Sequence, residues 1–284
     1  SIHAEIAPWS PEKYGSLAQQ LGPPTNVAMQ FAPNDIIAAQ AHVASPQLGP
    51  PTHMFAAIKD SVPPQPEEFD GILNIYRSLR GIPGYLGAWP KPGALDRLPL
   101  GLGLGQPVGP GMNRLIGGLY RYTDGAFSVL SFQPEVLQAS VPFLAATEVD
   151  DEAQIRVRAG NLRGSQIEDW VNGQLYERAR EGSVAGADFL SQLTRQLRVE
   201  PDSVLTSSKR ILGVDLQCTL GGEYQYSNAG DHWVSTAWQG ETAPQVVPAE
   251  YVAPVMKWFR GANAAITQHD DRVVADAVID IARQ

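Results

Sequence analysis

The chain has 284 residues, of which 43% are hydrophobic and 18% charged, a balance typical of a globular protein and unlike that of a disordered one. Its formal net charge of −9 argues against a nucleic-acid partner, because a protein that neutralises phosphates needs a surplus of Lys and Arg on one face. The sequence has no run of about 18 apolar residues, so it predicts no membrane span. We therefore expect a soluble protein.

Neither the start of the chain nor its cysteine content assigns a compartment. The chain begins at Ser1, which is compatible with a processed N-terminus. Cys218 is the single cysteine, so an internal disulfide and a cysteine-based metal cluster are both excluded. Its small and apolar neighbours predict a buried, unreactive thiol.

The first half of the chain predicts two strands and a helix. Residues 26–33 and 52–59 have the short apolar runs of strands. Residues 66–81 predict a helix with one apolar face, which consists of Phe69, Ile72, Leu73, Tyr76 and Leu79.

A glycine-rich stretch, "LGLGLGQPVGPG" at residues 100–111, invites comparison with phosphate-binding loops. A dinucleotide fingerprint needs a glycine three positions after Gly105, where this chain has Val108. A P-loop ends in Gly-Lys-Ser/Thr, and this stretch contains no lysine. The surrounding prolines predict a long loop, so we expect a linker over 82–113 and no cofactor.

The second half repeats the pattern of the first. Residues 117–132 alternate around Thr123-Asp124-Gly125 and predict a hairpin, and Pro134 predicts the start of a helix. A strand over 153–160 and a helix over 165–181 follow. Phe31 and Pro33 correspond to Phe132 and Pro134 at almost the same offset that relates "YRSLRG" to "YERAREG". This agreement predicts an internal duplication.

The C-terminal part predicts three further helices and another hairpin. The helices are expected over 186–199, 201–213 and 269–284. The hairpin, residues 221–239, aligns with 117–133 in its glycines and aromatic side chains. Either this segment is a shortened third copy, or it resembles the others because all hairpins obey the same turn rules.

Together these elements predict an α+β fold of antiparallel hairpins with helices packed on one face, built from internally duplicated β-β-α-β-α units. The predicted parts are a first unit at 1–81, a Pro/Gly-rich linker at 82–113, a second unit at 114–200 and a C-terminal part at 201–284.

Motifs for catalysis and metal binding are absent from the sequence. It contains neither a G-x-S-x-G nucleophile elbow nor an H-E-x-x-H zinc motif. The acidic run 148–152 lacks the central glycine of a calcium loop and is interpreted as a solvated turn. We expect no metal site.

The last hairpin holds the one cluster of chemically versatile residues. Its aromatic members, Tyr224, Tyr226 and Trp233, are the candidate binding residues, since such rings stack on sugars and peptides. Packing explains the same aromatics without a ligand, and Trp238 is expected to be buried. Glu223, Asp231 and His232 are weak candidates for catalysis.

The function expected from these features is a non-catalytic binding or structural module with an unidentified protein, peptide or carbohydrate partner. The alternative is an enzyme whose site is assembled in the cleft between the repeat units. A deep pocket with converging titratable side chains would favour the enzyme.

Overall fold

The structure is a computed structural model that describes residues 1–7, 19–46, 49–62, 80–97, 103, 105–238 and 240–282. The helix predicted over 66–81 lies almost entirely outside these residues, as do residues 100–102 of the glycine-rich stretch. The chain divides into two compact units. Unit 1 comprises Ser1–Ile167 and Trp258–Gln284, and unit 2 comprises Glu168–Lys257.

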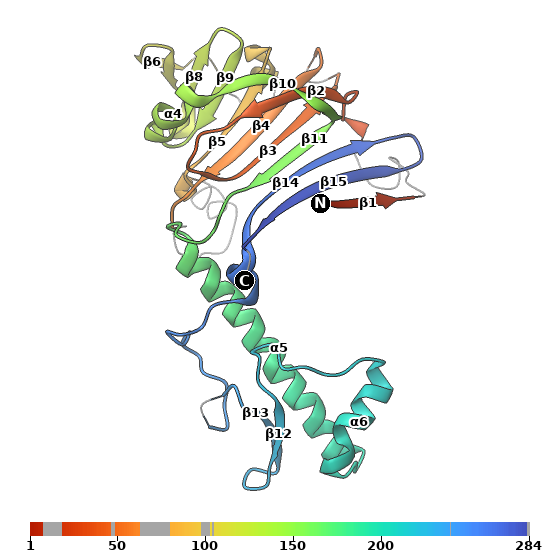
Figure 1. The fold of residues 1–284 in the computed structure, drawn as a ribbon. Helices are drawn as coiled ribbons and strands as arrows, with labels where there is room; N and C mark the ends of the chain where they lie inside the picture. Colours follow the sequence, from red (N-terminus) through yellow and green to blue (C-terminus); the bar gives the residue numbers. More distant parts are fainter. Residues whose placement is uncertain are drawn as a thin grey trace. The chain divides into compact units, whose positions relative to one another are not determined.

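Unit 1 is built on one antiparallel sheet, in which the described residues form eleven strands in the order β1-β15-β14-β11-β3-β4-β5-β9-β8-β7-β6 (Figure 1). The bounds in this order are Ile2–Ile6, Val273–Ile281, Phe259–Gln268, Ile155–Ala159, Asp35–Val43, Thr52–Lys59, Gly84–Trp89, Phe127–Ser131, Tyr120–Asp124, Met112–Arg114 and Gln106–Gly109.

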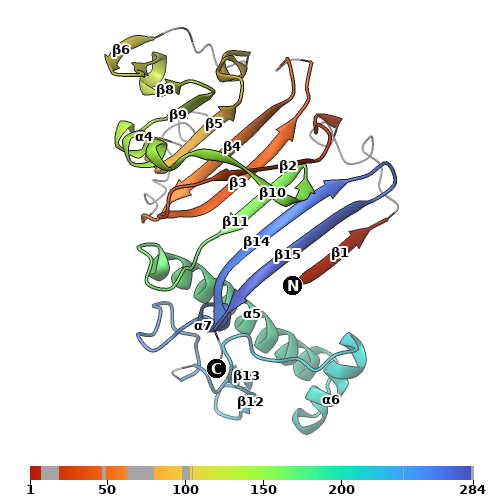
Figure 2. The same cartoon turned by 45° about the horizontal axis from the view of Figure 1, so that its top comes forward.

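A two-stranded ribbon crosses one face of this sheet. It pairs β2 (Thr25–Gln30) with β10 (Ala145–Ala153), and Figure 2 shows it lying over the middle strands. The described part of unit 1 also contains helix α4 (Pro134–Ser140) and the short 3-10 helices η1 (Pro92–Arg97), η2 (Ile116–Gly118) and η3 (Val141–Phe143). We call the side of the sheet under the ribbon the ribbon face and the opposite side the open face.

Alternation along the strands assigns side chains to the two faces. In β3, Ala38, Gln40 and His42 are buried on the ribbon face, while Ile37 on the open face is exposed. The main core lies on the ribbon face and contains Met29, Ala38, Phe55, Ala57, Tyr85, Val129, Val136 and Leu137. A second cluster, Ala88, Ala94, Leu95, Leu115 and Leu130, lies beside η1 on the other side. The fold is therefore a mixed one dominated by its sheet, and the helices do not gather on one face.

The internal duplication is not confirmed. Phe31 and Phe132 each follow a strand, but Pro134 opens α4, whereas the chain after Pro33 turns directly into β3. A short apolar match at the end of a strand thus recurs without the element that should follow it. The predicted unit boundaries stay predictions, although compactness divides the chain at other positions.

Three predicted elements differ from the structure. Residues 269–284 were expected to form a helix, but β15 occupies Val273–Ile281, because the apolar side chains of "VVADAVIDI" also recur at every second position, as in a strand. The expected linker over 82–113 supplies β5, a central strand, and the hairpin β6–β7. The acidic run 148–152 is part of β10 and not a turn.

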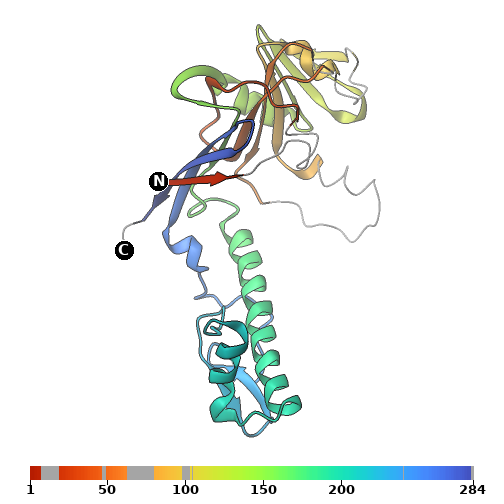
Figure 3. The same ribbon diagram turned by 90° about the vertical axis from the view of Figure 1, so that its right-hand side faces the viewer.

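Unit 2 is arranged around one long helix, α5 (Glu168–Gln196). Helix α6 (Pro201–Leu212) and the hairpin of β12 (Tyr224–Ser227) and β13 (His232–Ser235) lie beside its C-terminal half (Figure 3). The core between them contains Ala187, Leu190, Leu193, Val204, Cys218, Tyr224 and Trp233. A short helix, α7 (Pro254–Trp258), leads from this unit into β14. None of the helices in the described residues is long and apolar enough to cross a membrane.

A buried ion pair lies beneath the ribbon-face core of unit 1. The Lys59 ammonium is 3.0 Å from Asp35 Oδ1, and both side chains are almost completely buried. Asp35 Oδ2 accepts hydrogen bonds from the Tyr85 hydroxyl (2.5 Å) and from the backbone N–H of Ala32 (2.9 Å). Burial, with the hydrogen bond to Asp35, raises the pKa of Tyr85 well above its usual range. Asp35 therefore accepts hydrogen bonds from three donors and is the ion-pair partner of the buried Lys59.

We predict that Asp35→Ala lowers the free energy of unfolding by about 3–5 kcal/mol, because it leaves the Lys59 charge buried without its ion-pair partner and with only the hydrogen bond to Asn34 Oδ1. Asp215→Ala, which breaks the exposed pair with Lys209, is the control and should cost less than about 1 kcal/mol. Urea denaturation followed by circular dichroism measures both. Equal losses would contradict a structural role for the buried pair.

Candidate functional site

The hairpin β12–β13 carries the residues that the sequence singled out, and the structure places their aromatic rings in the core of unit 2. Tyr224 and Trp233 are 7% and 5% exposed. The Tyr224 hydroxyl donates to the backbone oxygen of Ser183 at 3.0 Å, and Trp233 Nε1 donates to Thr194 Oγ1 at 2.9 Å. Both rings therefore fasten the hairpin to α5. Their predicted role in binding stays untested, and neither ring presents a stacking face to solvent.

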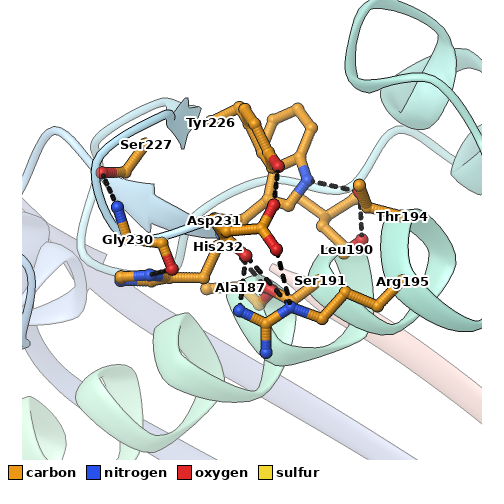
Figure 4. Close-up of polar contacts among 11 residues, drawn as sticks. Ala187, Leu190, Ser191, Thr194, Arg195, Tyr226, Ser227, Gly230, Asp231 and His232 are labelled. Atoms are coloured by element: carbon orange, nitrogen blue, oxygen red, sulfur yellow. Dashed lines mark hydrogen bonds and ion pairs between the residues drawn. The ribbon is translucent and has the colours of Figure 1, made fainter.

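Asp231 and His232 lie together at the turn of the hairpin (Figure 4). The Asp231 carboxylate accepts a hydrogen bond from the Tyr226 hydroxyl, and this bond raises the pKa of Tyr226. Arg195 on α5 donates to the backbone oxygen of Asp231 at 2.5 and 3.0 Å. The His232 ring donates from Nδ1 to the Gly230 oxygen at 2.9 Å. These contacts shape the turn, where Asp231 has a φ of 52° in the left-handed region.

Glu223 does not join Asp231 and His232. It lies before β12, where its N–H donates to Thr236 Oγ1 at 2.8 Å, whereas His232 pairs with Ser227 at the other end of the hairpin. The four steps along the chain from residue 223 to residue 227 span about 13 Å of extended chain. The three catalytic candidates are thus split between opposite ends of the hairpin, and their predicted role stays untested.

The thiol of Cys218 belongs to a polar network that the sequence did not predict. The hydroxyls of Ser183 and Ser235 lie 3.1 and 3.0 Å from Sγ, and Trp238 Nε1 donates to Ser183 Oγ at 2.9 Å. Burial acts to raise the pKa of Cys218, but these hydrogen bonds outweigh it and lower the pKa. Trp238, which was expected to be buried, is half-buried and packs against this core.

A groove in unit 1 lies between the ribbon and the sheet. It has a volume of about 860 Å³, which is in the range of small-molecule sites. Its floor is the ribbon face of β11, β14, β15 and β1, and the residues that define it are Arg156, Arg158, Asn263, Thr267, Asp276 and His3. Its roof includes Gln30 of β2 and Asp151 and Glu152 of β10.

Side-chain amides hold the roof of the groove on the sheet. Gln40 on β3 accepts from the backbone N–H of Met29 at 2.5 Å and donates to the oxygen of Val27 at 2.8 Å. Gln154 donates to the Gly22 oxygen at 2.6 Å. These bonds satisfy backbone groups that β2 would otherwise leave unpaired in the interior.

Arg156 connects the floor of the groove to β10. Its guanidinium pairs with the Asp151 carboxylate at 2.5 Å and donates to the backbone oxygen of Asp151 at 2.5 Å. Arg158, two residues further along β11, points to the same face and is exposed. Among the described residues Arg158 has no ion-pair partner, so its positive charge is available to a ligand.

At the edge of the sheet, His3 on β1 and Asp276 on β15 form a second pair, with Nδ1 2.7 Å from Oδ1. The hydrogen bond to Asp276 raises the pKa of His3. Sequence reasoning missed the whole groove. The available signal was the alternation of arginine with apolar residues in "IRVRA", which indicates a strand with one polar and one apolar face.

We predict that Trp233→Ala lowers the free energy of unfolding by about 3–5 kcal/mol, because it removes a buried ring and the partner of Thr194. Trp170→Ala on α5, where the ring is 43% exposed, is the control and should cost about 0.5 kcal/mol or less. Circular dichroism in urea measures both losses. A small loss of unfolding free energy for Trp233→Ala would contradict the packing role and favour a binding role for this ring.

We also predict a pH-dependent stability from His53 on β4, which stacks on His42 at 4.6 Å between ring centroids. Burial, then the charges of His42 and Arg156, lowers the pKa of His53 from 6.5 to about 4. Between these values the unfolded chain binds a proton that the folded protein does not, so stability falls as the pH falls from 6.5 to 4. His53→Phe should flatten this slope in urea titrations, whereas His269→Phe, at an exposed site, should not. Identical slopes would refute the assignment.

Within the described residues, no group of three or more His, Cys, Asp or Glu side chains is placed to hold a metal ion. No protein-family profile, curated protein sequence or solved structure matches this chain. The functional conclusion therefore rests on the geometry of the hairpin and of the groove.

Proposed function

We propose that this protein is a non-catalytic binding module and that its ligand occupies the groove beneath the ribbon. The observation that carries this proposal is a hollow of about 860 Å³ in unit 1 that is lined by apolar residues and by several polar side chains and roofed by β2 and β10. Sites of roughly 300–1,000 Å³ hold small-molecule ligands of drug-like size.

The lining favours a ligand with a carboxylate. Arg158 supplies an exposed guanidinium, which binds carboxylates through two parallel hydrogen bonds. Asn263, its cross-strand neighbour on β14, adds an amide that both donates and accepts. Asp151 and Asp276 also line the groove, and their negative charges work against the binding of a second anion near them. We therefore assign the anionic end of the ligand to Arg158 and its neutral polar part to the rest of the groove.

Binding is favoured over catalysis because two carboxylates of the groove, Asp151 and Asp276, are each held in an ion pair. Asp151 is paired with Arg156, and Asp276 is paired with His3. In the hairpin of unit 2, Asp231 is engaged by Tyr226 and lies at the opposite end from Glu223. The enzyme alternative thus gains no specific observation from the residues described.

Thermal unfolding with matched ligands tests the proposal. The probes are a glutamate tripeptide and glucuronate, with a glutamine tripeptide and glucose as their neutral counterparts. A ligand present at about 100 times its Kd adds about 2.7 kcal/mol to the free energy of unfolding, which corresponds to a rise in Tm of roughly 5–10 °C. We expect at least one acidic probe to give such a rise and its neutral counterpart to give none.

Arg158→Gln should abolish the rise, because it removes the charge but keeps a polar side chain. Arg178→Gln, at an exposed position of α5, is the matched control and should keep it. If neither acidic probe stabilises the protein, or if Arg158→Gln is stabilised as much as the unaltered chain, the groove is not the carboxylate site proposed here.

A further inference from the structure

The open face of the sheet in unit 1 is apolar over five neighbouring strands. Side chains along a strand alternate between the two faces of the sheet. In β1, β15, β14, β11 and β3, every second side chain therefore points to the open face, and the strand register aligns these side chains across neighbouring strands. Over residues 2–6, 273–281, 262–268, 155–159 and 37–43, every such side chain is Ala, Val or Ile except Gln268, at the end of β14. Phe259 and Arg260, at the register shift where β14 begins, lie outside this set. The same strands carry Arg156, Arg158, Asp276, His3 and Glu5 on the ribbon face.

This apolar face is exposed. The exposed fractions of its larger side chains are 53% for Ile2, 57% for Ile6, 47% for Ile37 and 36% for Val157. In an antiparallel sheet the polar face contacts water and the apolar face packs against another layer. Contiguous apolar patches of more than a few hundred Å² are rare on monomers, so the composition of this face indicates a partner.

The pattern of large and small side chains on the open face restricts the shape of the surface that can pack against it. Ile155 and Val157 of β11, with Ile266 of β14, form a ridge. A shallow trough, Ala39 and Ala41, lies beside this ridge on β3. A second trough, Ala275 and Ala277, lies on its other side on β15. The partner must therefore be apolar, nearly flat and grooved at the spacing of β-strands.

We propose that two copies of this chain pack through their open faces about a twofold axis parallel to the strands. With the axis along β14, the middle one of the five strands, Ile155 and Val157 of each copy lie over the Ala275–Ala277 trough of the other. The same patch then contacts itself, as in an isologous dimer. Two sheets packed in this way lie about 10 Å apart and bury both apolar faces.

The size and charge of the face agree with this occupant. Five strands with about four open-face residues each contribute about twenty side chains, and stable interfaces contribute roughly 20–30 per side. The open-face side chains of residues 2–6, 37–43, 155–159, 262–268 and 273–281 carry no charge, so they offer no electrostatic recognition to an acidic or basic partner. A second copy supplies a surface with the same composition and relief.

The mass of the protein in solution, measured by light scattering after size-exclusion chromatography, tests the proposal. The unaltered chain should have twice the mass of one chain, and Val157→Glu should have the mass of a monomer with an unchanged circular dichroism spectrum. Val278→Glu is the matched control, because Val278 is 53% exposed on β15 but lies on the ribbon face. It should remain a dimer.

Chemical cross-linking tests the proposed dimer if Val157→Glu does not fold. Ala264→Cys on β14, treated with a short bismaleimide, should give a covalent dimer, because the two copies of residue 264 face each other across the proposed axis. Val278→Cys and the unaltered chain, whose Cys218 is buried, should not. A monomer at all concentrations would overturn the proposal and assign the face to other residues of the chain. A dimer cross-linked through Val278→Cys alone would overturn the choice of face.

Discussion

The architecture of unit 1 depends on one side-chain amide beneath the ribbon. Gln40 bonds the N–H of Met29 and the oxygen of Val27, and so takes the place of a neighbouring strand along one edge of β2. A buried backbone group without a partner costs about 1–3 kcal/mol, so the ribbon cannot settle on the sheet unless these groups are satisfied. The ribbon is thus held over β3 by Gln40. The groove lies next to this contact, and Arg156 and Arg158 on β11 form part of its floor.

The two faces of the same strands suggest two different uses. On the ribbon face, polar side chains border a hollow and one arginine is unpaired, which suits a ligand with a carboxylate. On the open face, the described side chains are almost all aliphatic, which suits a second layer of protein. Strand alternation separates the two surfaces by only the thickness of the sheet. A change at one residue, such as Val157, therefore leaves its neighbour Arg158 on the opposite surface.

The sequence predicted local elements better than their pairing. The hairpin expected over 117–132 is β8–β9, and the helix expected over 201–213 is α6, which ends at a left-handed Gly213. Both depend on neighbouring residues and turn chemistry. Strand β11 pairs with β3 and with β14, which are both far from it in the sequence. No local sequence pattern specifies such pairings. For the same reason the groove was missed, whereas the candidate hairpin was found because its residues are contiguous, although its aromatic rings serve the core.

Amide hydrogen exchange in Gln40→Leu measures most directly whether this residue holds the ribbon over the groove. Losing the partners of Met29 and Val27 costs about 1–3 kcal/mol each, and every 1.4 kcal/mol of local stability corresponds to about tenfold in exchange rate. We predict exchange at least about tenfold faster across β2 and the paired part of β10, with β14 and β15 as protected as before. Unchanged protection of β2 and β10 would contradict the account.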